Sequence, residues 1–161
     1  LSFLAIFSLV SAGDICAYTS RNCIGGFGCC SNILPGTCCL FSTGYGWSTR
    51  FQNMPQTQYW LGTTYGDRCT TSTGGAGDSN GNICLSVYPG PTYLNAKSAN
   101  WKADRLNTRS FEGDASESDC MRMNVIGFTT ENGEEKRFEV PKDRTFEEVD
   151  GFLKAGRYEE L

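Results

Sequence analysis

Cysteine is the residue type with the most chemistry to offer in this chain of 161 residues, which has nine cysteines and no histidine. Eight of the nine cysteines lie between Cys16 and Cys84. Without histidine the chain can form no Ser-His or Cys-His nucleophile pair, no zinc-protease motif and no histidine general base. The sequence therefore predicts that its cysteines serve structure rather than catalysis.

The cysteine spacing is typical of the disulfide framework of a secreted protein. Adjacent residues on a strand face opposite ways, so we expect the pairs at 29–30 and 38–39 to bridge to different partners. The one pairing that we predict is Cys69 with Cys84, which would close the loop 70–83. A metal cluster is the alternative, but it would need Cys-x-x-Cys pairs or histidines, so we expect no metal and no cofactor. The cysteines predicted to form disulfides are Cys16, Cys23, Cys29, Cys30, Cys38, Cys39, Cys69 and Cys84.

Cys120 is the cysteine that this framework leaves over. An odd cysteine in a secreted protein indicates a free thiol or an intermolecular bridge, so Cys120 is our candidate for a disulfide-linked dimer. The alternative is that Cys120 joins the framework and that another cysteine is the odd one.

Aromatic residues are the candidates for ligand binding, and Tyr59 and Trp60 are adjacent. On a strand the two side chains would face opposite sides, which leaves one exposed unless both faces are covered. An exposed aromatic ring can stack on a sugar or anchor a protein partner, so we predict Tyr59 and Trp60 as ligand-binding residues for a glycan or an extracellular protein. The alternative is one core residue and one residue at the rim of the core.

Carboxylates are the only groups left that could support an enzyme, as in glycoside hydrolysis. No motif brings any two of them together, and acidic residues usually lie at the surface. We therefore expect no catalytic residue and a protein that is not an enzyme, with an extracellular carboxylate-based glycoside hydrolase as the alternative. The available carboxylates are Asp67, Asp78, Asp104, Glu112 and Asp114.

Residues 1–12 resemble a signal peptide, because an apolar run, Leu1 to Val10, is followed by the small residues Ser11 and Ala12. This leader and the cysteine framework together predict a secreted, extracellular protein. No later segment is apolar enough to span a membrane. The formal net charge of −4 and the isoelectric point near 4.8 argue against nucleic acid as a partner.

Residues 13–90 are expected to form a cysteine-rich β domain, because Thr- and aromatic-rich stretches alternate with Gly, Asn and Pro. We predict a disulfide-stabilised Greek-key β-sandwich, in which residues 74–77 form a flexible loop and residues 78–82 a polar turn that needs no calcium. The clearest strand candidates are residues 17–19, 47–51, 58–61 and 83–87.

A weak internal repeat runs through this domain. Ala17-Tyr18 is followed by a polar turn with Arg21, then Cys23 and Gly25, and the order returns in Thr64-Tyr65, Arg68, Cys69 and Gly74. With Ser48 on a strand between the copies, the arrangement resembles the Greek-key motif of the βγ-crystallin-like superfamily, which some small cysteine-rich secreted proteins of fungi adopt. In that motif an aromatic residue opens a hairpin that folds over and closes at a glycine, and a strand with a serine follows. The resemblance covers residues 14–90 and implies a role at the cell exterior.

Residues 91–119 are expected to form a connecting segment, and residues 120–161 a ββα unit, so that the whole fold is mainly β with an α+β tail. Asn132-Gly133 between two apolar runs predicts a hairpin with a type I′ turn. Pro141 should end the second strand, and Thr145 with Glu148 forms a capping box at the start of a helix. Gly151 inside that helix suggests close packing.

These observations predict a secreted, non-enzymatic, cysteine-rich protein that acts as an effector, a toxin or a wall-associated binding protein.

Overall fold

The computed structural model describes residues 11–87, 95–103 and 120–160. With 44% strand and 12% helix, it confirms the mainly β fold class. The α-helix is α1 (Phe146–Lys154), and η1 (Arg21–Cys23) and η2 (Tyr158–Glu160) are short 3-10 turns. The strands are β1 (Gly13–Tyr18), β2 (Gly26–Ile33), β3 (Cys39–Leu40), β4 (Ser48–Gln52), β5 (Trp60–Tyr65), β6 (Ser72–Asp78), β7 (Ile83–Ser86), β8 (Ser98–Ala103), β9 (Met121–Arg122), β10 (Val125–Thr129) and β11 (Glu135–Glu139).

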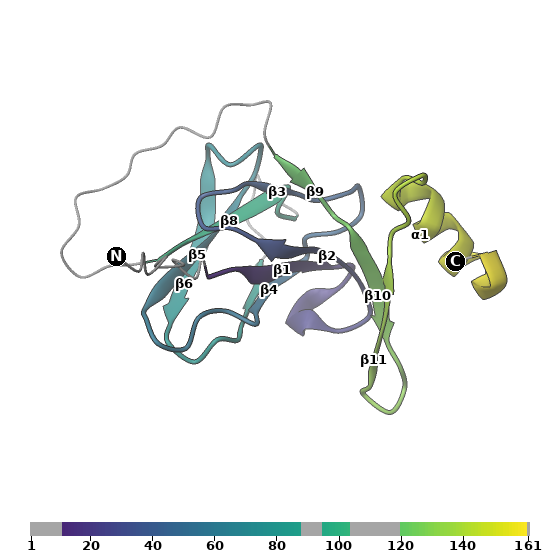
Figure 1. The fold of residues 1–161 in the computed structure, drawn as a ribbon, viewed down its shortest axis with the longest axis horizontal. Helices are drawn as coiled ribbons and strands as arrows, with labels where there is room; N and C mark the ends of the chain where they lie inside the picture. Colours follow the sequence, from purple (N-terminus) through teal and green to yellow (C-terminus); the bar gives the residue numbers. More distant parts are fainter. Residues whose placement is uncertain (1–10, 88–94, 104–119, 161) are drawn as a thin grey trace, which may run out of the picture.

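Two sheets form the body of the protein (Figure 1). Sheet A has the strand order β11-β10-β2-β1-β4-β7, and sheet B has the order β6-β5-β8-β3-β9. Among the first eight strands, β1, β2 and β4 lie in sheet A, but β3 lies in sheet B. Likewise β5, β6 and β8 lie in sheet B, but β7 lies in sheet A. This exchange ties the two sheets together as a Greek-key sandwich.

The main hydrophobic core lies between the sheets. Ile15 and Phe51 from sheet A meet Trp60 and Trp101 from sheet B, and none of the four side chains is exposed. The Trp101 indole Nε1 donates a hydrogen bond to the Ile33 carbonyl oxygen at 3.0 Å, which satisfies its polar group inside the core.

The strand candidates at 17–19, 47–51, 58–61 and 83–87 correspond to β1, β4, β5 and β7. Residues 74–77, expected as a flexible loop, instead lie in β6, an edge strand paired with β5. Glycine carries no side chain, so its run gives no alternating pattern. Residues 98–103, expected within a connecting segment, form the central strand β8. In β8 the polar residues Ser98 and Asn100 are buried together with Ala99 and Trp101, so the strand shows no clear apolar–polar alternation in the sequence.

Four disulfides staple the sandwich: Cys16–Cys29, Cys23–Cys84, Cys30–Cys39 and Cys38–Cys69. The adjacent cysteines bridge to different partners, as predicted. The predicted Cys69–Cys84 pair is wrong. Cys84 lies on β7 at the edge of sheet A, whereas Cys69 lies in the hairpin between β5 and β6 of sheet B. Cys120 is free and half-buried.

The hairpins that follow β1 and β5 are each held by a serine on a later strand. Ser48 Oγ accepts a hydrogen bond from the Cys23 amide at 2.9 Å and donates one to the Ser20 carbonyl at 2.6 Å. Ser98 Oγ accepts a hydrogen bond from the Cys69 amide at 2.9 Å and donates one to the Asp67 carbonyl. Tyr18 lies opposite Ser48 in the β-ladder, and Tyr65 lies opposite Ser98. The weak sequence repeat therefore corresponds to two similarly built hairpins.

The predicted β-hairpin of the C-terminal unit is β10 with β11. Its turn differs from the type I′ prediction: Gly133 has a φ of +82°, but Asn132 is not among the described residues with positive φ. The Gly133 amide bonds to the Thr130 carbonyl and the Thr130 amide to the Glu134 carbonyl, which is the pattern of a three-residue loop that ends in a left-handed glycine.

Helix α1 begins at the predicted capping box of Thr145 and Glu148, and Gly156 follows its end with a φ of +70°. Phe146 and Val149 face the core. The suggestion of close packing at Gly151 is wrong, since no atom lies within 4 Å of a β-carbon built there. Hydrogen bonds between β10 and β2 extend sheet A into this unit, so the unit docks directly on the sandwich (Figure 1).

Candidate functional site

Of the two predicted binding residues, Trp60 begins β5 and Tyr59 comes directly before it, and the two are buried to very different degrees. Trp60 is fully buried, and its ring lies 5.8 Å from that of Phe51 in the core. A side chain without exposed surface cannot stack on a ligand, so the binding prediction fails for Trp60 and continues with Tyr59 alone. Tyr59 retains 46% of its surface exposed.

The end of the Tyr59 side chain lies against β6. A β-carbon built on Gly77 would overlap the Tyr59 hydroxyl oxygen and lie 2.6 Å from the Tyr59 Cζ, so a larger residue at Gly77 would displace the end of the Tyr59 side chain. The next outward residue of β5 is Leu61, which is 44% exposed and stands opposite Gly77 in the β-ladder. Inward-facing Gly62 separates Leu61 from Thr63, the following outward position. The glycines of β6 therefore create a flat surface beside an exposed aromatic and an exposed aliphatic side chain.

We name this surface the Tyr59 face. Lys102 of β8, which stands opposite Leu61, adds a single cation at its other border. The hydroxyl end of the Tyr59 side chain packs against β6, and a partly exposed aromatic ring can stack on the apolar face of a pyranose ring. The Tyr59 face is made of Tyr59, Leu61, Thr63, Gly75, Gly77 and Lys102.

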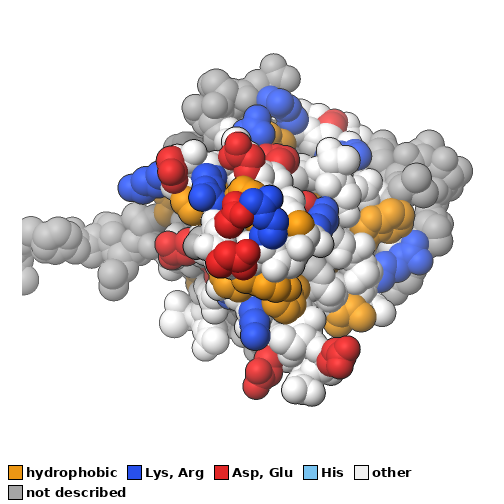
Figure 2. Space-filling view, turned by 90° about the vertical axis from the view of Figure 1, so that its right-hand side faces the viewer, with side chains coloured by type: hydrophobic (Ala, Val, Ile, Leu, Met, Phe, Trp, Pro, Cys, Tyr) orange, Lys and Arg blue, Asp and Glu red, His pale blue; other side chains and the backbone are white. Residues whose placement is uncertain are grey.

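A second aromatic cluster was not predicted from the sequence. The Phe128 ring lies 6.4 Å from that of Phe138 and 6.2 Å from that of Tyr158, which is 51% exposed. These residues come from β10, β11 and η2, so no sequence spacing joins them. Figure 2 looks at the face that carries α1, where hydrophobic patches lie among basic and acidic side chains. Phe128 and Phe138 are both partly buried, and their rings contact each other. This arrangement favours a packing role over ligand binding.

The carboxylates available for a hydrolase do not form a catalytic pair in the described residues. Asp67 accepts hydrogen bonds from the amides of Thr70 and Thr71 within its own hairpin. Hydrogen bonds from Thr70 and Thr71 hold the pKa of the Asp67 carboxyl well below its usual range, the reverse of what a general acid needs. Asp78 accepts hydrogen bonds from Ser79 and Asn80 in a tight turn. Asp104, Glu112 and Asp114 lie outside the described residues.

Neither a cluster of metal ligands nor a membrane-spanning helix occurs in the described residues, 11–87, 95–103 and 120–160. Within these ranges no group of three or more Cys, Asp or Glu side chains is placed to hold a metal ion. No helix in the same ranges is long and apolar enough to cross a membrane.

The fold and the four disulfides define a small, mainly β, disulfide-stabilised domain of a kind that is typical of extracellular proteins. Residues 14–124 match the model of a family described as an N-terminal domain, and the chain belongs to this family. The description names no activity. The match ends just before β10, so the β10–β11 hairpin and α1 lie beyond it. No curated protein matches the chain, and no solved structure matches it.

Proposed function

We propose that the protein is secreted and binds an extracellular glycan, such as a cell-wall polysaccharide, through the Tyr59 face, without catalysing a reaction. The observation that carries the proposal is the Tyr59 side chain, whose hydroxyl end packs against Gly77 and which leaves 46% of the residue's surface open. An aromatic side chain that packs over a glycine also stabilises a sheet edge, so the part of Tyr59 that a ligand could use is its exposed surface. The identity of the bound glycan would decide between a wall-associated role, an effector role and a toxin role.

Secretion is supported by the disulfides. Four disulfides in one small domain need an oxidising compartment in order to form and persist. The apolar run proposed as part of a signal peptide, residues 1–10, lies outside the described residues. Cys120 remains our candidate for an intermolecular disulfide, because the other eight cysteines pair with one another.

The resemblance to βγ-crystallin-like proteins also stays a proposal. It is supported by the two hairpins, each opened by a tyrosine and held by a serine. It is further supported by the exchange of β3 and β7 between the sheets. The comparisons provide no link to that superfamily.

Pull-down on insoluble polysaccharides and binding to a glycan array test the proposal. Tyr59→Ala should weaken binding by about 1 to 2 kcal/mol, roughly 5- to 30-fold, as expected for the loss of an aromatic anchor. Tyr158→Ala is the matched control, because Tyr158 is exposed to a similar degree on a different face. Equal binding by the two variants would remove the Tyr59 face from consideration. Release of reducing sugar from a bound glycan would favour the alternative, a glycoside hydrolase.

A further inference from the structure

A polar cleft of about 550 Å³ opens where the loops that follow β4 and β6 approach β11. The two loops are joined by a hydrogen bond of 3.1 Å from the Met54 amide to the Gly81 carbonyl. The volume of the cleft is within the range of small-molecule sites. Five carboxamides and one guanidinium line it: Gln52, Asn53, Gln56, Asn80, Asn82 and Arg137. We name it the carboxamide cleft.

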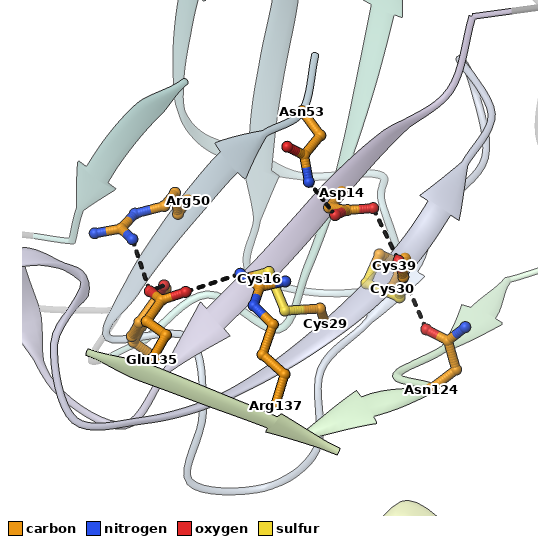
Figure 3. Close-up of a disulfide and its surroundings, with 12 residues drawn as sticks. Asp14, Cys16, Cys29, Cys30, Cys39, Arg50, Asn53, Asn124, Glu135 and Arg137 are labelled. Atoms are coloured by element: carbon orange, nitrogen blue, oxygen red, sulfur yellow. Dashed lines mark hydrogen bonds and ion pairs between the residues drawn. A yellow bond between two sulfur atoms is a disulfide. The ribbon is translucent and has the colours of Figure 1, made fainter. Parts of the chain in front are cut away.

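Gln52 is the residue that distinguishes this cleft from an ordinary polar surface. It is the last residue of β4 and is only 7% exposed, yet its carboxamide has no hydrogen-bond partner among the described residues. Its neighbour across the ladder, Asp14, already accepts hydrogen bonds from the Ser31 hydroxyl and the Asn32 amide. Asp14 also accepts one from the Asn53 carboxamide (Figure 3). The carboxamide of Gln52 is not among the fully enclosed polar groups left without a partner, and its place in the cleft lining makes it accessible to a ligand from that side. A ligand hydroxyl in the cleft can pair with this carboxamide.

The lining limits the chemistry of the ligand. Each carboxamide offers both donors and an acceptor, which matches hydroxyl groups that also donate and accept. An anion would require more positive charge than the single guanidinium of Arg137, which already pairs with Glu135 at 2.9 Å. A metal ion would require carboxylates, and none lines the cleft. An apolar ligand would leave the carboxamide of Gln52 without a partner.

We propose that the carboxamide cleft binds a unit of a neutral saccharide. The cleft shares no lining residue with the Tyr59 face. The cleft proposal takes only the class of ligand, a saccharide, from the proposed function. It adds the cleft as a second saccharide-binding site beside the Tyr59 face. Loops at the end of the sandwich and the β11 strand of the C-terminal unit build the site together.

Titration of the full chain with neutral tetrasaccharides, followed by NMR of the side-chain amide groups and by calorimetry, tests the proposal. The probes are chitotetraose, cellotetraose, laminaritetraose and mannotetraose, and trigalacturonate is the anionic comparison. The side-chain NH₂ signals of Gln52, Gln56 and Asn82 should shift with at least one neutral probe. Each titration is repeated in Tyr59→Ala, which isolates the cleft.

Gln56→Ala and Asn82→Ala should each weaken binding at the cleft about fivefold, as expected for one lost hydrogen bond between uncharged groups. Gln52→Met keeps the side-chain volume and removes the carboxamide, and it should weaken binding by about tenfold. Asn132→Ala removes an exposed carboxamide at the β10–β11 turn and should leave binding unchanged. Thermal unfolding of each variant identifies any loss that comes from misfolding.

Shifts of the cleft amides that persist in Tyr59→Ala support the cleft, whether or not the Tyr59 face binds. Binding that disappears in Tyr59→Ala but is unchanged in the three cleft variants overturns the cleft and leaves the proposed function standing. Tighter binding of trigalacturonate than of every neutral probe, or no binding of any neutral probe, overturns the cleft proposal.

Discussion

The side chain of Glu135, on β11, links the C-terminal hairpin to β1 and β4 of sheet A (Figure 3). Its carboxylate accepts hydrogen bonds from Tyr18 Oη at 3.0 Å, Arg50 Nη1 at 2.8 Å and Arg137 Nη2 at 2.9 Å. The two guanidinium groups cover a small second core, with Arg50 over the Tyr18 ring and Arg137 over the Phe27 ring. Burial raises the pKa of Glu135, but the hydrogen bonds from Arg137 and Tyr18 and the charges of both arginines outweigh it and leave the pKa below its ordinary value.

This lowered pKa predicts acid sensitivity with a defined sign. A carboxyl whose pKa is lower in the folded state stabilises the fold above its unfolded pKa, here near 4.5, and that contribution disappears as the pH falls through the folded value. Glu135→Gln should therefore lower the free energy of unfolding at neutral pH and reduce the loss of stability between about pH 6 and about pH 3. Urea denaturation across this range measures both effects.

Glu139→Gln is the control, because Glu139 is exposed on the same strand. If the two variants show the same pH profile, the contacts of Glu135 do not contribute to the acid response.

At the scale of single elements, the sequence predicted those segments whose side chains alternate or that carry a turn or cap signal. The β10–β11 hairpin and helix α1 with its capping box belong to this group. Strand β6 was missed because its glycines have no hydropathy pattern. Strand β8 was missed because its buried positions include Ser98 and Asn100, whose partners come from distant parts of the chain.

The candidate site followed the same rule. Tyr59 was found because its type and its neighbour Trp60 stand out in the sequence. The supporting glycine, Gly77, could not be assigned before the pairing of β5 with β6 was known. The carboxamide cleft joins two loops and β11, so no local pattern could have indicated Gln52.

The two serine-held hairpins allow a prediction about elements. Ser48→Ala should lower the free energy of unfolding by about 1 to 3 kcal/mol, because it leaves the buried amide of Cys23 without an acceptor. Ser98→Ala should cost less, because its hairpin at Cys69 is partly exposed and water can reach the amide. Urea denaturation of the oxidised proteins gives both values.

Ser86→Ala serves as the control for the serine series. Ser86 accepts a hydrogen bond from the Asn22 amide in an exposed setting, so its loss should change stability by no more than about 0.5 kcal/mol. A cost equal to that of Ser48→Ala would show that burial does not set the energy of these contacts.

At the scale of the molecule, the sandwich and the C-terminal unit share one core. Ile126 and Phe146 belong to the same buried cluster as Ile15 and Trp60. A β-carbon built on Gly28 of β2 would overlap the Phe146 ring, which shows how closely α1 approaches sheet A. The division of the chain into a cysteine-rich β domain and a ββα unit stays a prediction, because a shared core does not show whether the two parts fold separately.

The last prediction concerns this shared core. A chain limited to residues 13–124 would lose Ile126, Phe146 and Val149 from the core and would leave the β2 edge unpaired. Each large core side chain contributes about 2 to 5 kcal/mol, and an open edge promotes self-association. This shorter chain should therefore fail to fold or should associate through β2, as measured by near-ultraviolet circular dichroism and sedimentation.

A chain limited to residues 13–156 is the control, because it keeps α1. It should remain folded and monomeric when a mild reducing agent keeps Cys120 as a thiol and leaves the four disulfides intact. A folded, monomeric 13–124 chain with the urea midpoint of the full protein would show that the sandwich is an independent domain.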